Sequence, residues 1–152
     1  MKEYGENQRL EELLRSSALV AGGFMGSDTR SFFEVIDADA AVLARLGVPK
    51  EKIASRMRQI TDLAESGLGT WVWIDEHLQA KVDEARGGLV CPWPHPGRYA
   101  KRITTVTDAA LGETIRWSDL NIHLIGEHGF FEGKGSNFRI EPKELVRVIF
   151  ID

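Results

Sequence analysis

Cysteine is nearly absent from this sequence: the 152 residues contain one, so a disulfide-stapled fold is excluded. No apolar run approaches the roughly 20 residues that a membrane-crossing helix needs. The opening residues 1–6 lack the basic stretch of a secretory signal. With one thiol and no export signal, we expect a protein of the reducing cytoplasm that has no membrane partner.

Several catalytic motifs are also missing from the sequence. It contains no HExxH, G-x-S-x-G or GxGxxG pattern. Residues 129–136 hold the glycines, lysine and serine of a phosphate loop, but their spacing differs from GxxxxGK[ST], and they follow a predicted helix where a strand is required. We therefore interpret this segment as a flexible connector.

The overall composition is that of a globular protein. Hydrophobic residues make up 43% and charged residues 28%, and 23 acidic against 19 basic side chains give a net charge of −4. All prolines except Pro49, three of the four histidines and the cysteine lie in the second part of the chain. We place a soft boundary near Gly87-Gly88, between a helical part (1–86) and a metal-binding unit (87–152), although one continuous domain is equally compatible.

Helical periodicity dominates residues 1–69. Leu10, Leu14 and Ala18 recur at spacings of three and four, which predicts a helix that ends at Gly22-Gly23. A second helix begins at Ser31, whose side chain forms a capping box with Glu34. It ends at Gly47, and Pro49 starts a third helix. The buried face of this third helix is predicted to contain Ile53, Met57, Ile60 and Leu63.

The rest of the chain mixes strands and helices, so the predicted fold class is α+β. Alternation over residues 70–74 favours a short strand, and a polar helix is predicted over 78–87. Two β-rich runs, 103–107 and 113–117, flank a Gly-containing loop and predict a hairpin. A helix capped by Ser118 or Asp119 then runs to Gly129, and Pro142 opens the last helix.

Four potential metal ligands cluster in the second part. The pattern is C-x3-H in a proline-rich turn, followed after 27 residues by H-x4-H on a predicted helix, and it comprises Cys91, His95, His123 and His128. Zinc prefers four nitrogen or sulfur ligands in a tetrahedron, often two from a turn and two from a helix. The alternative is that these residues bind no metal: Cys91 is then a small buried apolar residue, and His123 is a histidine of the core. His77 lies outside the set and is expected at the surface.

The order of ligand-bearing turn, hairpin and ligand-bearing helix resembles that of the treble-clef and Cys/His zinc-finger families, over about residues 89–131. This resemblance implies a zinc site at Cys91, His95, His123 and His128. The turn departs from a zinc knuckle because His95 replaces a second cysteine and the turn is one residue longer. Residues 122–131 also look like segments of uncharacterised bacterial proteins.

The spacing of the two helical histidines creates a geometric difficulty. At about 100° per residue, side chains five positions apart point some 140° away from each other. His123 and His128 should therefore not reach one ion from a regular helix, and we expect the helix to tighten or end between them, near Gly126.

A basic stretch suggests a different function. Residues 42–53 resemble a helix-turn-helix, and the helix 49–66 carries four cations suited to phosphate contacts: Lys50, Lys52, Arg56 and Arg58. The acidity of the whole chain favours a solvated charged face instead.

Together these patterns predict a zinc-binding protein with a structural, four-ligand site, acting as an adaptor for an unknown protein partner. One alternative is a metal-dependent hydrolase, in which water replaces one histidine and Glu127 is the general base. The other is a nucleic-acid-binding protein that uses the basic helix.

Overall fold

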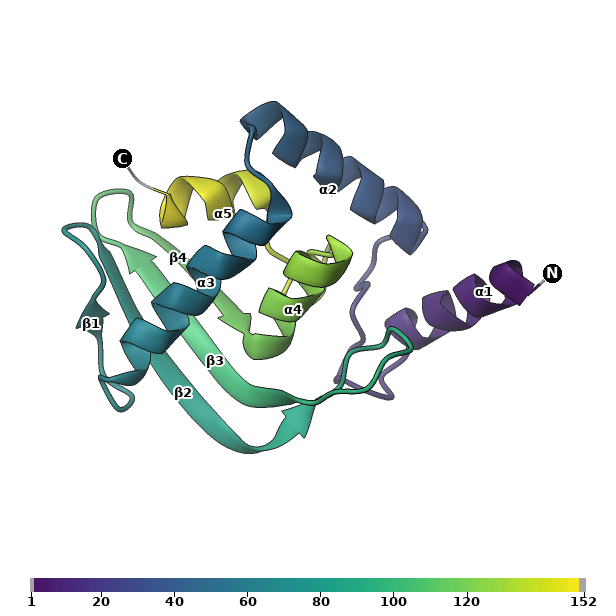
Figure 1. Cartoon of the computed structure of the whole chain (residues 1–152), viewed down its shortest axis with the longest axis horizontal. Coiled ribbons are helices and arrows are strands. Elements are labelled where there is room, and N and C mark those ends of the chain that lie inside the picture. The colour runs from purple at the N-terminus through teal and green to yellow at the C-terminus, as the bar shows by residue number, and fades with distance from the viewer. Residues whose placement is uncertain (1, 151–152) are drawn as a thin grey trace.

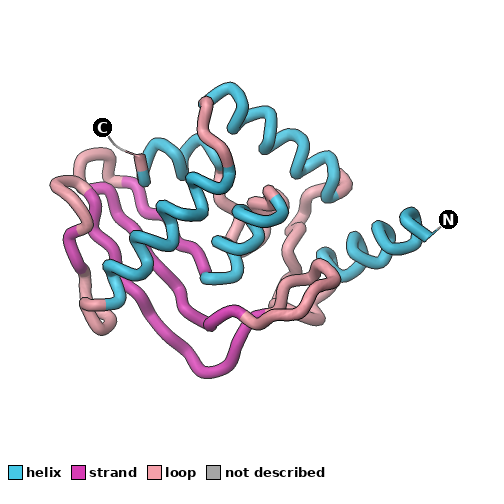
Figure 2. The backbone as a smooth tube through the Cα atoms, viewed as in Figure 1, coloured by secondary structure: helices cyan, strands magenta, loops and turns pink. Residues whose placement is uncertain are grey.

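The protein has an α+β fold, as the sequence predicts, with helices packed over an antiparallel sheet (Figures 1 and 2). The computed structural model describes residues 2–150. In chain order the elements are α1 (Lys2–Arg15), α2 (Phe32–Leu46), α3 (Lys50–Glu65), β1 (Val72–Trp73), β2 (Leu78–Leu89), β3 (Tyr99–Asp108), β4 (Glu113–Ser118), α4 (Asp119–His128) and α5 (Pro142–Ile149). Within this range, no helix combines the length and the apolar content needed to cross a bilayer.

The sheet is a four-stranded antiparallel meander in the order β1-β2-β3-β4. Helices α3 and α4 contact each other and the sheet, and α5 contacts both α2 and α3 (Figure 1). The main core lies between these helices and the sheet. At its centre Trp117 is fully buried and donates its indole N–H to Thr61 Oγ1 at 2.9 Å, so the largest core side chain has its polar atom satisfied.

Several predicted helix boundaries are confirmed. Ser31 and Glu34 form the predicted capping box at α2, and Gly47 ends that helix in a left-handed conformation with a φ of 68°. Pro49 is the N-cap of α3, and Pro142 opens α5. These boundaries depend on interactions within three or four residues, which is why the local sequence is sufficient to predict them.

The first helix and the stretch after β1 differ from prediction. Helix α1 ends at Arg15, well before Gly22-Gly23, because the Ala18 N–H donates to the Ser16 hydroxyl and the Leu14 carbonyl accepts from the Phe24 N–H instead of from Ala18. The predicted helix over residues 78–87 is wrong, because this stretch belongs to β2. A spacing of four between Leu78 and Val82 suits either structure, but Leu78, Ala80 and Val82 are all buried, which is the period of a strand.

Strand β2 therefore adds sheet to a region predicted to be helical, and it continues through Gly87-Gly88. Its pairing with β3 shifts register between Glu84 and Gly88, which marks a bulge. In Figure 1 both strands curve strongly toward the ligand-bearing loop. One prediction within α3 is also wrong: Leu63 is 47% exposed, and Ala64 occupies the buried face instead.

Candidate metal centre

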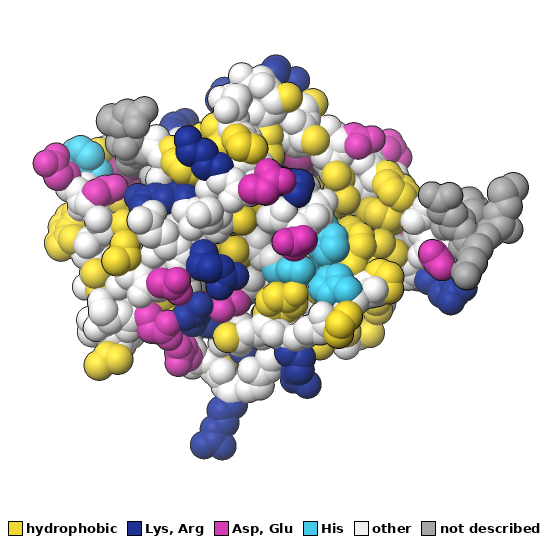
Figure 3. Space-filling view, in the orientation of Figure 1, with side chains coloured by type: hydrophobic (Ala, Val, Ile, Leu, Met, Phe, Trp, Pro, Cys, Tyr) yellow, Lys and Arg dark blue, Asp and Glu magenta, His cyan; other side chains and the backbone are white. Residues whose placement is uncertain are grey.

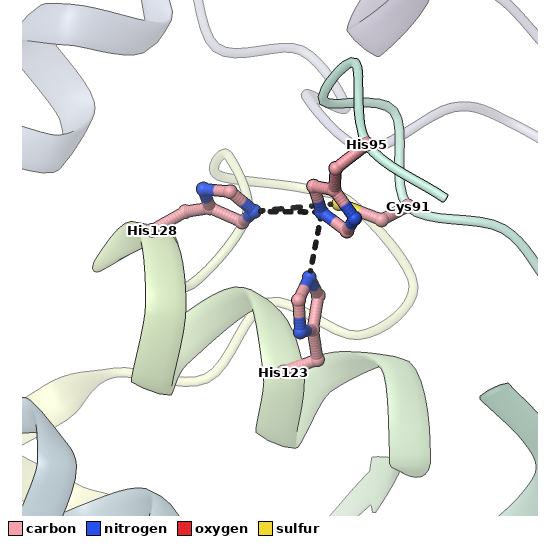
Figure 4. A group of neighbouring side chains, drawn as sticks. All are labelled: Cys91, His95, His123 and His128. Atoms are coloured by element: carbon pink, nitrogen blue, oxygen red, sulfur yellow. Dashed lines mark hydrogen bonds between the residues drawn. The ribbon is translucent and has the colours of Figure 1, made fainter. Parts of the chain in front are cut away.

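Two platforms bring the four potential ligands together. Cys91 and His95 lie in the loop that connects β2 to β3, and His123 and His128 lie on α4 (Figure 4). One ligand atom from each side chain falls within 4.8 Å of the other three. Side chains up to 37 positions apart in the sequence are thus gathered at one point, where they could hold a metal ion.

Capping residues at both ends fix the extent of α4, the helix that carries His123 and His128. Ser118 accepts from the Asn121 backbone N–H, and the Asn121 side chain accepts from the Ser118 N–H, which completes a capping box. Gly129, with a φ of 64°, ends the helix directly after His128. The histidines therefore stand on a short helix whose two ends are both defined.

The expected break in this helix does not occur. Both histidines belong to α4, which continues without interruption to His128. Figure 4 shows how they nevertheless converge: the two imidazoles extend from the helix and turn toward His95, which enters from the loop between them. The two side chains leave the helix in different directions, as expected. The imidazole side chain is long enough to overcome this difference in direction.

Three of the six distances among the donor atoms are close to those around a tetrahedral ion. His95 Nε2 lies 3.0 Å from His123 Nε2 and 3.3 Å from His128 Nε2, and Cys91 Sγ lies 3.5 Å from His128 Nε2. Zinc bonds of about 2.0–2.1 Å to nitrogen and about 2.3 Å to sulfur place neighbouring ligands about 3.4 Å apart for two nitrogens and about 3.6 Å apart for nitrogen and sulfur. These three pairs are near the spacings of a zinc tetrahedron, and all six pairs lie within 4.8 Å.

Hydrogen bonds at the far side of the rings select the tautomer that metal binding needs. His95 Nδ1 lies 3.0 Å from the Pro96 carbonyl oxygen, and because a carbonyl can only accept, the hydrogen of that imidazole is on Nδ1. Its Nε2 then presents a lone pair to the Nε2 atoms of both His123 and His128. The single lone pair on His95 Nε2 cannot form good hydrogen bonds with two ring nitrogens at once. A cation at the centre would bind the lone pairs of all three imidazole nitrogens.

The surroundings keep the imidazoles of His123 and His128 neutral. Burial, followed by the neighbouring His123 and His95, lowers the pKa of His128 to about 4. Burial and His95 also lower the pKa of His123. Burial raises the pKa of the Cys91 thiol to about 11. At neutral pH His123 and His128 are thus ready to bind a metal, while Cys91 must release a proton on coordination.

Sequence analysis missed two aromatic side chains that hold the ligands. The Trp93 ring stacks on His128 with centroids 4.1 Å apart and 9° between planes, and it also packs edge-on against Phe130 at 5.5 Å. The Tyr99 hydroxyl lies 3.0 Å from His123 Nδ1. Trp93 sits between the two loop ligands in sequence, which was an available signal, but nothing local indicates that Tyr99 reaches His123.

The remaining histidine and the candidate base occupy exposed positions. His77 is exposed in the turn before β2 and away from the cluster, as predicted. Glu127 is exposed on α4, and its charge acts on His123. Three of the four ligands are partly exposed, and Figure 3 shows histidine side chains gathered at this surface of the molecule.

The cations of the basic helix are not equally available to a ligand. Lys50 donates to the Gly126 carbonyl at 2.7 Å, and Arg56 donates to the carbonyl of Ile149 at 3.0 Å. Lys52 lies over the Phe150 ring, 5.5 Å from its centroid, whereas Arg58 is exposed. Two of the four predicted phosphate contacts are therefore engaged in tying α3 to α4 and α5.

The segment 129–136 is not a flexible connector. Phe130, Phe131 and Glu132 are all buried, and a Cβ atom on Gly133 would lie 2.3 Å from the Met25 carbonyl oxygen. Glu132 has a positive φ of 69°, which is uncommon for a residue other than glycine. Its carboxylate accepts from Asn121 Nδ2 at 2.6 Å. The segment is thus a packed part of the core that carries a buried acid.

Comparison of the chain with protein-family models, with curated proteins and with solved structures gave no match. The arrangement of turn, hairpin and helix is present, but no family assignment follows from it. Conclusions about function therefore depend on the chemistry of the Cys/His cluster.

Proposed function

We propose that this chain is a zinc-binding protein in which Cys91, His95, His123 and His128 hold one structural ion. The observation that carries the proposal is the set of donor distances of 3.0, 3.3 and 3.5 Å, which match neighbouring vertices of a zinc tetrahedron. One sulfur and three imidazoles form a donor set that favours zinc over magnesium or calcium, which prefer oxygen. Four protein ligands leave no position open, and this is the property of a structural site.

The proposed role of the metal is to fasten the loop between β2 and β3 to α4. Cys91 and the aromatic Trp93 belong to a second, smaller core with Phe32, Leu124 and Phe130. An ion would join both sides of this core by bonds from the loop and from the helix. The treble-clef resemblance agrees with this role, and a thiolate ligand favours the reducing cytoplasm as the compartment.

The ligand count distinguishes this proposal from a hydrolase with an open zinc position. The hydrolase alternative has one observation in its favour, the partial exposure of the three histidines next to Glu127. X-ray absorption on zinc-loaded protein should give one sulfur and three nitrogens and no oxygen. A spectrum with one sulfur, two imidazoles and a bound water would instead support the hydrolase, with Glu127 as its base.

Tyr99 gives a test of the site that leaves all four ligands in place. When Nε2 of His123 binds metal, its Nδ1 carries a hydrogen that the Tyr99 oxygen can accept at 3.0 Å. We expect Tyr99→Phe to weaken zinc binding by about 10–100-fold, the usual effect of losing such a partner. Competition with a chromophoric chelator measures it. Thr107→Val, which removes a hydroxyl contact to Thr114 on the hairpin, is the control and should bind zinc normally.

As an adaptor, the protein needs a surface for its unknown protein partner. We propose the edge of the sheet at β1, where Trp71 and Trp73 are 43% and 58% exposed and Leu68 is 90% exposed. Aromatic residues are enriched in protein interfaces. Trp73→Ser should keep the fold and the zinc but abolish binding to any partner identified with the unaltered protein. Unchanged binding would contradict the use of this edge.

Binding of nucleic acid is the less favoured proposal, because Lys50 and Arg56 are engaged within the protein. We expect no measurable affinity for duplex DNA or RNA at about 50 mM salt, where phosphate contacts are strongest. Fluorescence anisotropy with a labelled duplex is the measurement. Binding that weakens in Arg58→Gln and in Lys52→Gln would show that the exposed end of the basic helix does contact phosphates.

A further inference from the structure

A cavity of about 420 Å³ forms a second candidate site, separate from the Cys/His cluster. Its walls come from the loop after α1, from β2 and β3, and from the chain on either side of α4, and none of the four metal ligands lines it. This volume lies within the range of about 300–1,000 Å³ that is typical of small-molecule sites. The cavity therefore has the size of a binding pocket.

Most of the lining is apolar, and its principal side chains are Leu19, Phe24, Leu89, Ile103, Leu120 and Phe138. An apolar group of complementary shape would remove this apolar surface from water, which favours its binding.

The polar groups of the cavity are predominantly acidic. Asp83, Glu84 and Glu132 line it, against the single ammonium group of Lys101. Glu132 is only 5% exposed and accepts from Asn121 Nδ2 at 2.6 Å and from Ser136 Oγ at 3.0 Å. An ionised carboxylate has about four acceptor sites, so these two bonds leave capacity for a further donor.

We propose that this cavity binds an aliphatic amine, with the apolar body against the hydrophobic lining and the protonated nitrogen at Glu132. An ammonium group carries donors only and is positive, which suits a carboxylate with spare acceptor sites, whereas an anion would meet a net negative lining. The left-handed backbone of Glu132 fits this role, because strained residues concentrate at ligand sites. Burial raises the pKa of Glu132 to about 7, so the carboxylate is ionised at pH 8 and a bound ammonium would favour that form.

Three probes of equal chain length test the proposal on zinc-loaded, full-length protein at pH 8: n-octylamine, n-octanol and octanoate. By calorimetry, we expect octylamine to bind at least tenfold more tightly than octanol, and octanoate not to bind. Equal binding of amine and alcohol, or no binding of the amine, would overturn the proposal.

Two substitutions with matched controls locate the site. Glu132→Gln should remove the tenfold preference for the amine while octanol still binds, whereas Glu144→Gln, at an exposed position of α5, should leave the preference intact. Ala85→Trp should fill the cavity and abolish binding of both probes, and Ala109→Trp, in the exposed hairpin turn, should not. Amine binding that survives Ala85→Trp would refute this location, even if Glu132→Gln failed to fold.

Discussion

Removal of the metal should lower the thermal midpoint of this protein by about 10 °C. A ligand that binds only the folded state stabilises it by about 4 kcal/mol when its free concentration exceeds Kd a thousandfold. In a chain of this size, each kcal/mol corresponds to about 2–4 °C. Protein purified without an affinity tag should contain about one zinc per chain, and calorimetric melting before and after chelation measures the change.

Substitutions of the ligands should reproduce the effect of chelation. Cys91→Ser removes the single sulfur ligand, so we expect zinc affinity to fall more than about 100-fold, beyond the loss caused by an outer hydrogen-bond partner. His77→Asn is the matched control, because His77 is exposed and lies outside the cluster. It should retain both the zinc and the melting temperature. A chelated protein with an unchanged midpoint would contradict a structural role and support the hydrolase.

Glu132→Gln should stabilise the protein at alkaline pH and leave its stability unchanged in acid. Burial raises the pKa of Glu132 from an ordinary value of 4.5 to about 7. Between these values the folded protein retains a proton that the unfolded chain has released, so stability falls as pH rises and the loss is complete above pH 7. A shift of this size corresponds to roughly 3 kcal/mol. Glutamine does not ionise, so the variant should not lose stability as the pH rises.

Urea unfolding of both proteins at pH 5 and pH 9 measures this difference. Titration of the histidines works in the opposite direction: because the pKa of His128 is lowered to about 4, its contribution is lost as the pH falls from about 6.5 toward 4. Both proteins share that contribution, so it cancels when they are compared. Glu144→Gln should show no pH-dependent gain. Equal stability differences at the two pH values would mean that Glu132 is not buried as the structure describes it.

A buried acid that lowers stability at physiological pH requires a compensating reason. Glutamine would accept the bond from Asn121 Nδ2, and its amide would donate to Ser136 Oγ in place of the present bond, without the desolvation cost of a carboxylate. The proposed amine site supplies a reason, because the carboxylate would then be the recognition group of the cavity. Proteins commonly retain such locally unfavourable residues at functional sites.

The sequence by itself determined the boundaries of most helices, the hairpin and the identity of the candidate ligands. Ser31 and Glu34, Gly47 and Pro142 act through hydrogen bonds or backbone preferences that extend only a few residues. The four candidate ligands were recognisable because the single cysteine and three of the four histidines cluster in the second part of the chain. These features are local in sequence, so they do not depend on how the chain packs.

Tertiary structure alone decided the remainder. Leu78 and Val82 are compatible with helix or strand, and pairing with β3 selects the strand. Convergence of His123 and His128 depends on His95 entering from a loop 28 and 33 residues away, which no helical wheel describes. Similarly, Glu132 lies in a glycine-rich run that suggests a flexible loop. Only its hydrogen bond from Asn121 and the close approach of Gly133 to Met25 place the acid in the wall of a cavity. Contacts between residues distant in sequence depend on the whole chain, and local patterns therefore cannot specify them.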